Sequence, residues 1–151
     1  MPDVFWEESM GNEKPRFLKM DNGTIYDSVT SVTWMANDSY LDLEKEVSYS
    51  EAEEYVKQVN QKKVGGYSDW RMPTIHEASS IFDKEKLNKD SKGGDIFLDS
   101  IFPPGAANCT WTSSIRGKEA QILFYANGCP YWYEKNDQTI SHAVRLVRRD
   151  N

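Results

Sequence analysis

The clearest hydrophobic periodicity in the chain runs from Ser50 to Asn60. Apolar residues recur there at the spacing i, i+3, i+4 and i+7, which places them on one face of a helix: Ala52, Tyr55, Val56 and Val59. Ser50 can cap this helix, and Glu53 stands three residues later, as a capping box requires. The pattern predicts an amphipathic helix that buries one stripe.

A second helix is predicted immediately after Pro73. Thr74 and Glu77 have the spacing of another capping box, so the helix should begin at this point. Its inner face would consist of Ile75, Ala78, Ile81 and Phe82.

Before these helices the pattern is that of strands. Arg16 to Met20 and Thr24 to Tyr26 flank Asn22-Gly23, a dipeptide typical of a two-residue type I′ hairpin turn. Val29 to Met35 reads as a further strand, with one face at period two formed by Val32, Trp34 and Ala36.

From Cys109 onward the chain again looks like strands. Arg116 to Glu119 can turn the chain, and Ala120 to Ala126 is apolar on both faces, which predicts a central strand. After the turn at Asn127-Gly128, further strands are predicted at Tyr131-Trp132-Tyr133 and from Ala143 to Arg148. Strands, two helices, a long loop and then strands indicate the α+β class, since α/β sheets need alternation.

Composition and charge limit the function. The chain has 151 residues, which suits a single domain over residues 1–151. Its net charge of −6 opposes nucleic acid as a partner, and no apolar run is long enough for membrane insertion. The first residues do not form an export signal, so we expect a cytoplasmic chain, or an exported or periplasmic one whose signal has been removed.

Four blocks of sequence resemble one known family. They are RFLKMDNGTIYDSVTSVTWM, SYSEAEEYV followed by SDWRMPTIHE, FPPGAANCTWTSS and AVRLVR. They occur in order from about Arg16 to Arg148, the motif-bearing core at about 16–148, and resemble the bacterial Lcl C-terminal domain family, named for a collagen-like adhesin. The resemblance implies a C-type lectin-like fold: two helices packed on small, curved, mostly antiparallel sheets, with adjacent N- and C-terminal strands. Formylglycine-generating enzymes share that fold.

The chain departs from the family pattern in two ways. Tyr55 and Leu146 stand near positions where the family often has cysteines, so that disulfide cannot form. The adhesin binds sulfated polysaccharides, which need positive charge, and this acidic chain does not invite the same ligand.

The tryptophan-containing motifs favour a structural role. Arg71 in Trp70-Arg71-Met72-Pro73-Thr74 could mark an anion site, but we expect its guanidinium to be buried against a carboxylate or carbonyls. The structural core should then contain Trp34, Trp70, Arg71, Trp111 and Arg145.

The best candidate for ligand binding is the triple aromatic segment and its polar neighbours. Consecutive side chains on a strand point to opposite faces, so at least one of the three should point outward. The candidate ligand-binding residues are Asn127, Tyr131, Trp132, Tyr133, Asn136 and Asp137. Flat aromatic faces beside amides suit sugar rings or a protein surface; the alternative is that the aromatics cap a small core.

Catalytic chemistry has little support in the sequence. Cys109 and Cys129 flank the predicted hairpin and could form a disulfide after loop adjustment. His142 has no triad partners, and we expect no metal site and no cofactor. The leading hypothesis is a non-enzymatic module that binds a glycan or a protein surface. The alternatives are an oxidative enzyme of the formylglycine-generating type that uses both cysteines and a metal, or a structural subunit that forms homo-oligomers through its aromatic surface.

Overall fold

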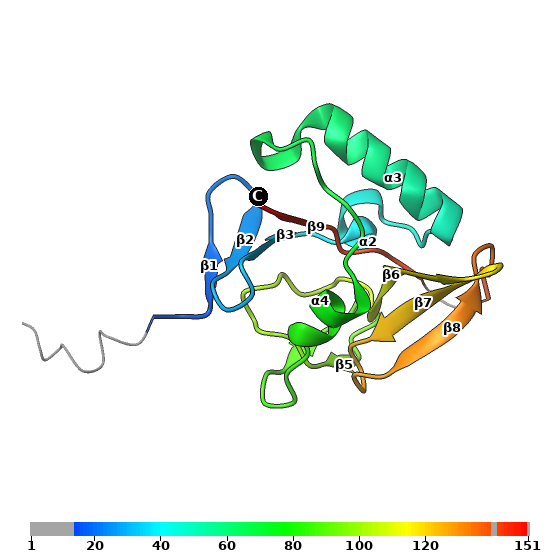
Figure 1. Ribbon diagram of the computed structural model, residues 1–151. Coiled ribbons are helices and arrows are strands. Elements are labelled where there is room, and N and C mark those ends of the chain that lie inside the picture. Colours follow the sequence, from blue (N-terminus) through cyan, green and yellow to red (C-terminus); the bar gives the residue numbers. More distant parts are fainter. Residues whose placement is uncertain (1–13, 140–141, 151) are drawn as a thin grey trace, which may run out of the picture.

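A computed structural model describes residues 14–139 and 142–150 and has an α+β architecture, as predicted. The first part of the described chain contains β1 (Phe17–Lys19), β2 (Thr24–Asp27), β3 (Val32–Met35), α2 (Ser39–Leu43), α3 (Tyr49–Lys62), the 3-10 turn η1 (Val64–Gly66) and α4 (Ile75–Ser80). The second part contains β4 (Asn88–Lys89), β5 (Asp95–Ile96), β6 (Cys109–Arg116), β7 (Glu119–Phe124), β8 (Pro130–Glu134) and β9 (Val147–Arg149). Figure 1 shows α3 on one side of the molecule and β6, β7 and β8 on another.

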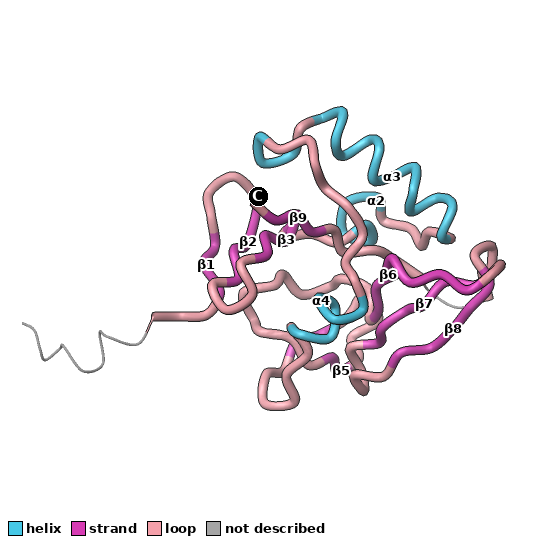
Figure 2. Tube along the Cα trace, in the orientation of Figure 1, coloured by secondary structure: helices cyan, strands magenta, loops and turns pink. Residues whose placement is uncertain are grey.

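The strands form antiparallel sheets in the order β1-β2-β3-β9, β4-β5 and β6-β7-β8. The N-terminal hairpin and the last strand therefore share one sheet, with β9 beside β3 rather than beside β1. In the third sheet β7 pairs on both sides, which confirms the prediction of a central strand. Figure 2 shows how much of the chain between these short strands is loop.

The prediction of a two-residue type I′ turn at Asn22-Gly23 is wrong. Gly23 has a φ of 84°, but Asn22 is not in the left-handed region, and Met20 N–H closes a longer loop onto Thr24 C=O at 2.9 Å. The Asn22 side chain accepts hydrogen bonds from the main-chain N–H and the hydroxyl of Thr24. Asn22 thus shapes the turn through its side chain and not through a positive φ.

Two strand boundaries also differ from the prediction. The strand expected from Val29 begins at Val32, because the Asp27 carboxylate holds a turn by accepting from Val29 N–H and the Thr30 hydroxyl. The last strand contains only Val147–Arg149. Its expected first part, from Ala143, does not pair with one strand, because its carbonyl groups accept single hydrogen bonds from Trp111 in β6, Ser39 in α2 and Met35 in β3.

The helices confirm one capping box and correct the other. Thr74 and Glu77 cap α4 as predicted. Helix α3 begins two residues before the predicted start, because Ser48 and Glu51 form its capping box in place of Ser50 and Glu53. The prediction of only two helices is wrong: α2 also forms, capped by Asp38. No helix in the described residues is long and apolar enough to cross a membrane.

Buried side chains form two hydrophobic clusters, one on each side of the β6-β7-β8 sheet. The first contains Trp70 and Trp111 and joins α3 to the sheet; the second contains Trp34 and joins α4 to the first sheet. Arg145 is 2% exposed, with its guanidinium over the Phe102 ring. Because Trp34, Trp70 and Trp111 are buried, none of them can contact a ligand at the surface.

Arg71 joins two elements, one through its side chain and one through its main chain. Its guanidinium makes a two-bond ion pair with Glu77 at the start of α4, at 2.8 and 2.9 Å. Its N–H and C=O both bond to Val147 in β9 at 2.9 Å. The carboxylate partner was expected, but the Arg71 side chain is 42% exposed and not buried.

The Glu77 carboxylate accepts hydrogen bonds from both Arg71 and Thr74 N–H at this junction. Burial alone would raise the pKa of Glu77, but hydrogen bonds from Arg71 and Thr74 N–H, with the nearby charge of Arg149, outweigh it and lower the pKa to about 2. A lowered carboxyl pKa stabilises the fold above the unfolded-state pKa near 4.5 and loses that contribution as the pH falls toward 2.

We predict that Glu77→Gln lowers the free energy of unfolding at pH 7 by about 2 kcal/mol, because it removes the charge that pairs with Arg71. Urea denaturation measures the loss, and the difference from wild type should shrink below pH 4.5. Asp95→Asn is the matched control, since it breaks the exposed Lys89–Asp95 pair and should cost less than about 0.5 kcal/mol. Equal losses in the two variants would contradict the role given to Glu77.

Candidate functional site

The three consecutive aromatics in β8 point to two different faces of the sheet. Tyr131 and Tyr133 both contact the Phe124 ring, with centroids 5.5 and 6.1 Å apart, on the face that packs against the first cluster. Trp132 lies on the opposite face, is partly exposed and belongs to neither hydrophobic cluster. Among the strands of this sheet, Trp132 is the one aromatic residue on the face opposite the first cluster. The second cluster takes only Leu123 from these strands, so this face is an outer face at Trp132.

The neighbours of Trp132 on the outer face are polar. The guanidinium carbon of Arg116 lies 4.4 Å from the centroid of the Trp132 ring, which is a cation–π contact. Gln121 is directly opposite Trp132 in the β7-β8 pairing, and Glu119 is opposite Glu134. We call this group the Trp132 face: Trp132, Arg116, Glu119, Gln121 and Glu134.

Arg116 is held in place on the Trp132 face. Its Nε and Nη2 both donate to Oε1 of Glu119, at 3.1 and 2.9 Å. Apart from Trp132, none of the residues of this face was among the candidates predicted from the sequence. The turn predicted at Arg116 to Glu119 contained the signal, because a two-residue turn there places Arg116 directly opposite Glu119.

The remaining candidate residues do not gather around Trp132. Asn127 lies in the β7-β8 loop, where its side chain accepts from Cys129 N–H at 3.0 Å. Asn136 and Asp137 follow the other end of β8, and the Asp137 carboxylate accepts from the N–H and the hydroxyl of Thr139. A strand of five residues, roughly 16 Å long, separates the two groups. The structure therefore does not join the predicted residues into one site.

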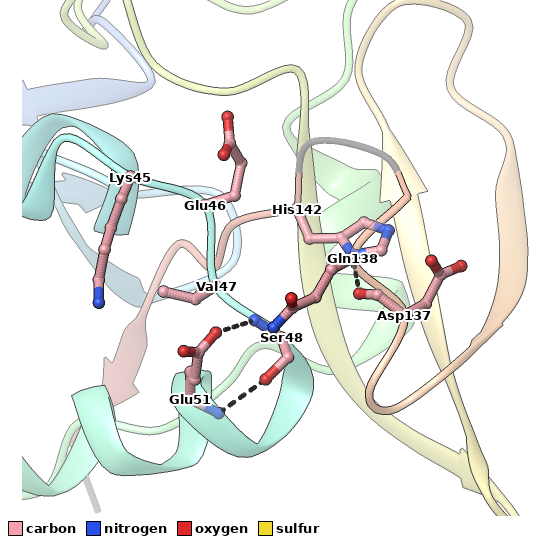
Figure 3. Close-up of a pocket in the computed structure, with 8 residues that line it drawn as sticks. All are labelled: Lys45, Glu46, Val47, Ser48, Glu51, Asp137, Gln138 and His142. Atoms are coloured by element: carbon pink, nitrogen blue, oxygen red, sulfur yellow. Dashed lines mark hydrogen bonds between the residues drawn. The ribbon is translucent and has the colours of Figure 1, made fainter.

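A cavity of about 290 Å³ lies between the α2-α3 loop, the start of α3 and the segment after β8. Figure 3 shows the residues that line it: Lys45, Glu46, Val47, Ser48, Glu51, Asp137, Gln138 and His142. Its carboxylates have structural partners: Glu51 accepts from Ser48 N–H at 2.8 Å, and Asp137 bonds to Thr139. The cavity is acidic, but these groups cap a helix and a turn and do not converge on a common point.

His142 is the most unusual titratable group beside this cavity. Its ring is 1% exposed and packs against Trp111 and Tyr133, with centroids 4.8 and 5.4 Å away. Nδ1 lies 3.1 Å from the Asp137 carbonyl, so Nδ1 carries the proton and donates it. In the described structure Nε2 is buried without a hydrogen-bond partner. Burial lowers the pKa of His142, and the opposing effect of Asp137 is smaller.

We predict that His142 makes the fold sensitive to mild acid. Because its folded pKa lies below the unfolded value near 6.5, stability is complete above that pH and falls as the unfolded chain takes up a proton. His142→Asn keeps a donor for the Asp137 carbonyl and removes the titration. Urea unfolding between pH 7.5 and about 5 should show a shallower pH dependence in this variant. His76→Gln, at an exposed histidine, is the control, and an unchanged slope in His142→Asn would contradict the prediction.

The two cysteines are free thiols in this structure, so the disulfide that the sequence leaves possible is not formed. A bulge in β6 between Trp111 and Ile115 places Cys109 opposite Phe124, and Cys129 lies beyond the next loop. Cys109 is buried, and burial raises its pKa to about 12, which makes it a poor nucleophile at neutral pH. In the described residues no three His, Cys, Asp or Glu side chains gather closely enough to hold a metal ion.

We predict that the two thiols of the native protein differ in reactivity. Cys129 is partly exposed and should react with a thiol reagent under native conditions, whereas Cys109 should react only after unfolding. A colorimetric thiol titration with and without denaturant measures this, with Cys129→Ser as the control that removes the native reaction. If the unfolded, unreduced protein contains no free thiol, the two cysteines form a disulfide and the prediction is wrong.

Comparison with known proteins gives one result that bears on identity. No curated protein matches the chain, and no solved structure matches it. The family model for the Lcl C-terminal domain matches residues 23–148, which is most of the chain. These residues include Trp34, the Arg71–Glu77 junction and the Trp132 face. The chain is therefore a member of the Lcl C-terminal domain family.

Proposed function

We propose that this domain is a non-enzymatic binding module that recognises a glycan on its Trp132 face. The observation that carries the proposal is the position of Trp132, a large aromatic side chain outside both hydrophobic clusters and partly open to solvent. An indole offers a flat apolar surface with one N–H donor, which suits the face of a sugar ring.

The polar border of Trp132 favours a glycan over a protein ligand. Sugar hydroxyls both donate and accept hydrogen bonds, and the Trp132 face supplies a guanidinium, an amide and two carboxylates. A protein ligand is the second candidate, because Trp and Arg are enriched at the centres of protein interfaces. Such centres are usually desolvated and depleted of acidic side chains, whereas Glu119 and Glu134 flank Trp132.

The charge of the molecule supports a neutral or weakly charged glycan. The chain has a net charge of −6, and Arg116 is already paired with Glu119. A sulfated polysaccharide would meet more repulsion than attraction on this face.

We also propose that the α+β fold is of the C-type lectin-like class. The support is the shared sheet of the N-terminal hairpin and the C-terminal strand, with helices packed against small antiparallel sheets. An oxidative enzyme that depends on Cys109 has less support, because burial keeps this thiol protonated.

Replacing Trp132 tests the proposal. A glycan array containing neutral and sulfated oligosaccharides should identify a ligand, and Trp132→Ala should weaken binding of the strongest neutral oligosaccharide more than tenfold. The same variant should change the free energy of unfolding by less than about 0.5 kcal/mol, as surface substitutions usually do.

Tyr133→Ala is the matched control for this experiment. Tyr133 is adjacent in sequence but packs on the opposite face, against Phe124 and His142. Its replacement should lower the free energy of unfolding by about 2 kcal/mol or more, since it leaves a cavity beside the first cluster. The proposal fails if Trp132→Ala destabilises the fold as much as Tyr133→Ala does, or if it leaves binding unchanged.

A further inference from the structure

The outer edge of β8 is open in the described structure, whereas the outer edge of β6 is occupied. On the β6 side, Trp111 N–H donates to Ala143 C=O and Ser113 N–H donates to Pro73 C=O, both at 2.9 Å. On the β8 side, no strand of the described chain pairs beyond β8. Figure 1 shows β8 along the outside of the molecule. An edge strand of this kind can pair with another chain.

Hydrogen bonds at the two ends of β8 fix the direction of its main chain. Phe124 N–H donates to Cys129 C=O at 3.1 Å, and Lys135 N–H donates to Lys118 C=O at 2.9 Å. Cys129 and Lys135 therefore both direct main-chain groups toward β7. Because this direction alternates from residue to residue along a strand, every second residue between them also faces β7.

The alternate residues of β8 direct their main-chain groups away from β7, toward the open edge. Tyr131 and Tyr133 bond to β7, and the main-chain groups that face the open edge belong to Pro130, Trp132 and Glu134. Pro130 has no N–H to donate. The Glu134 C=O already accepts from Asp137 N–H at 3.0 Å. The edge thus offers Pro130 C=O, Trp132 N–H and C=O, and Glu134 N–H.

We infer that β8 pairs antiparallel with β8 of a second copy of this chain, around a two-fold axis that lies midway between the two Trp132 residues. Each Trp132 N–H then donates to the Trp132 C=O of the other copy. Each Glu134 lies opposite Pro130 of the other copy, and its N–H donates to the Pro130 C=O. The Glu134 C=O, which already accepts from Asp137 N–H, faces Pro130 of the other copy, which has no N–H to donate. No main-chain group of the paired strands is therefore left without a hydrogen-bond partner.

This complementarity is the argument for a second copy over an unrelated peptide. An ordinary peptide strand would place an N–H opposite the occupied Glu134 C=O and leave it without a good acceptor. Proline usually protects an edge strand from pairing, but here Pro130 is compatible with one specific partner.

Side chains at the same edge agree with this partner. Tyr131 is 45% exposed although its neighbours Ile122 and Leu123 are fully buried. In the inferred pairing Tyr131 lies opposite Tyr133 of the second copy, at a position without main-chain hydrogen bonds, where side chains approach most closely. Pairing would therefore cover the exposed part of Tyr131.

Sedimentation equilibrium of the full chain tests the inference. The wild-type chain should form a dimer within the range of about 1 μM to 1 mM. Glu134→Pro removes the N–H of both copies and should weaken the dimer about tenfold or more. Trp132→Ala keeps the main-chain donor and acceptor and should retain dimerisation. A wild-type chain that stays monomeric throughout this range overturns the inference.

Amide hydrogen exchange of the wild-type chain gives a second test that needs no variant. Exchange of the Trp132 and Glu134 amides should slow as protein concentration rises, while that of the Tyr131 and Tyr133 amides, already bonded to β7, should not change. A dimer that leaves the Trp132 and Glu134 amides unprotected uses another surface and overturns the inference. Glycan binding by a wild-type chain that sediments as a monomer would overturn the dimer and leave the proposed function standing, so the two ideas can fail separately.

Discussion

The two-bond ion pair between Arg71 and Glu77 is the interaction on which the arrangement of the sheets depends. Glu77 caps α4, which packs against β6 and β7, and the main chain of Arg71 pairs with β9 in the first sheet. The C-terminal strand is thus tied to the helix that supports the third sheet. The neighbouring Trp70 is fixed by two hydrogen bonds between its main chain and the Asn60 side chain. One short motif therefore holds α3, α4 and β9 together.

The sequence predicted the elements whose signals are local. Pro73, Thr74 and Glu77 specify the start of α4 without help from the rest of the chain. The start of α3 was ambiguous, because both Ser48 and Ser50 precede a glutamate by three residues. Tertiary contacts favour Ser48: Tyr49 is buried, and its N–H bonds to Lys135 C=O. Helix α2 could not be predicted from its local sequence, because its capping residue Asp38 is also held by a hydrogen bond from the N–H of Ala107, which is distant along the chain.

The site was less predictable because it depends on register. Alternation along a strand implies that Trp132 and the two tyrosines face opposite ways, but not which face is buried. That choice follows from the pairing of β7 with β8, which places Tyr131 and Tyr133 beside Ile122 and Ala120 of the first cluster. The bulge in β6 shifts Cys109 relative to β7, and no sequence pattern specified it. In this structure the possible disulfide between Cys109 and Cys129 is therefore not formed, although both cysteines flank the predicted hairpin.

Trp132 links the proposed function to the inferred dimer, because its side chain and its main chain face different directions. The indole lies on the outer face of the sheet, while the N–H and C=O lie at the edge. A two-fold axis between the two Trp132 residues would bring the two indoles together on one continuous face, with an Arg116 and a Gln121 on each side. Two weak sugar contacts on one rigid surface bind a repeating glycan more tightly than either does alone, since the second contact is intramolecular. A domain with one aromatic on this face would in this way gain affinity for a polymer without gaining a deeper pocket.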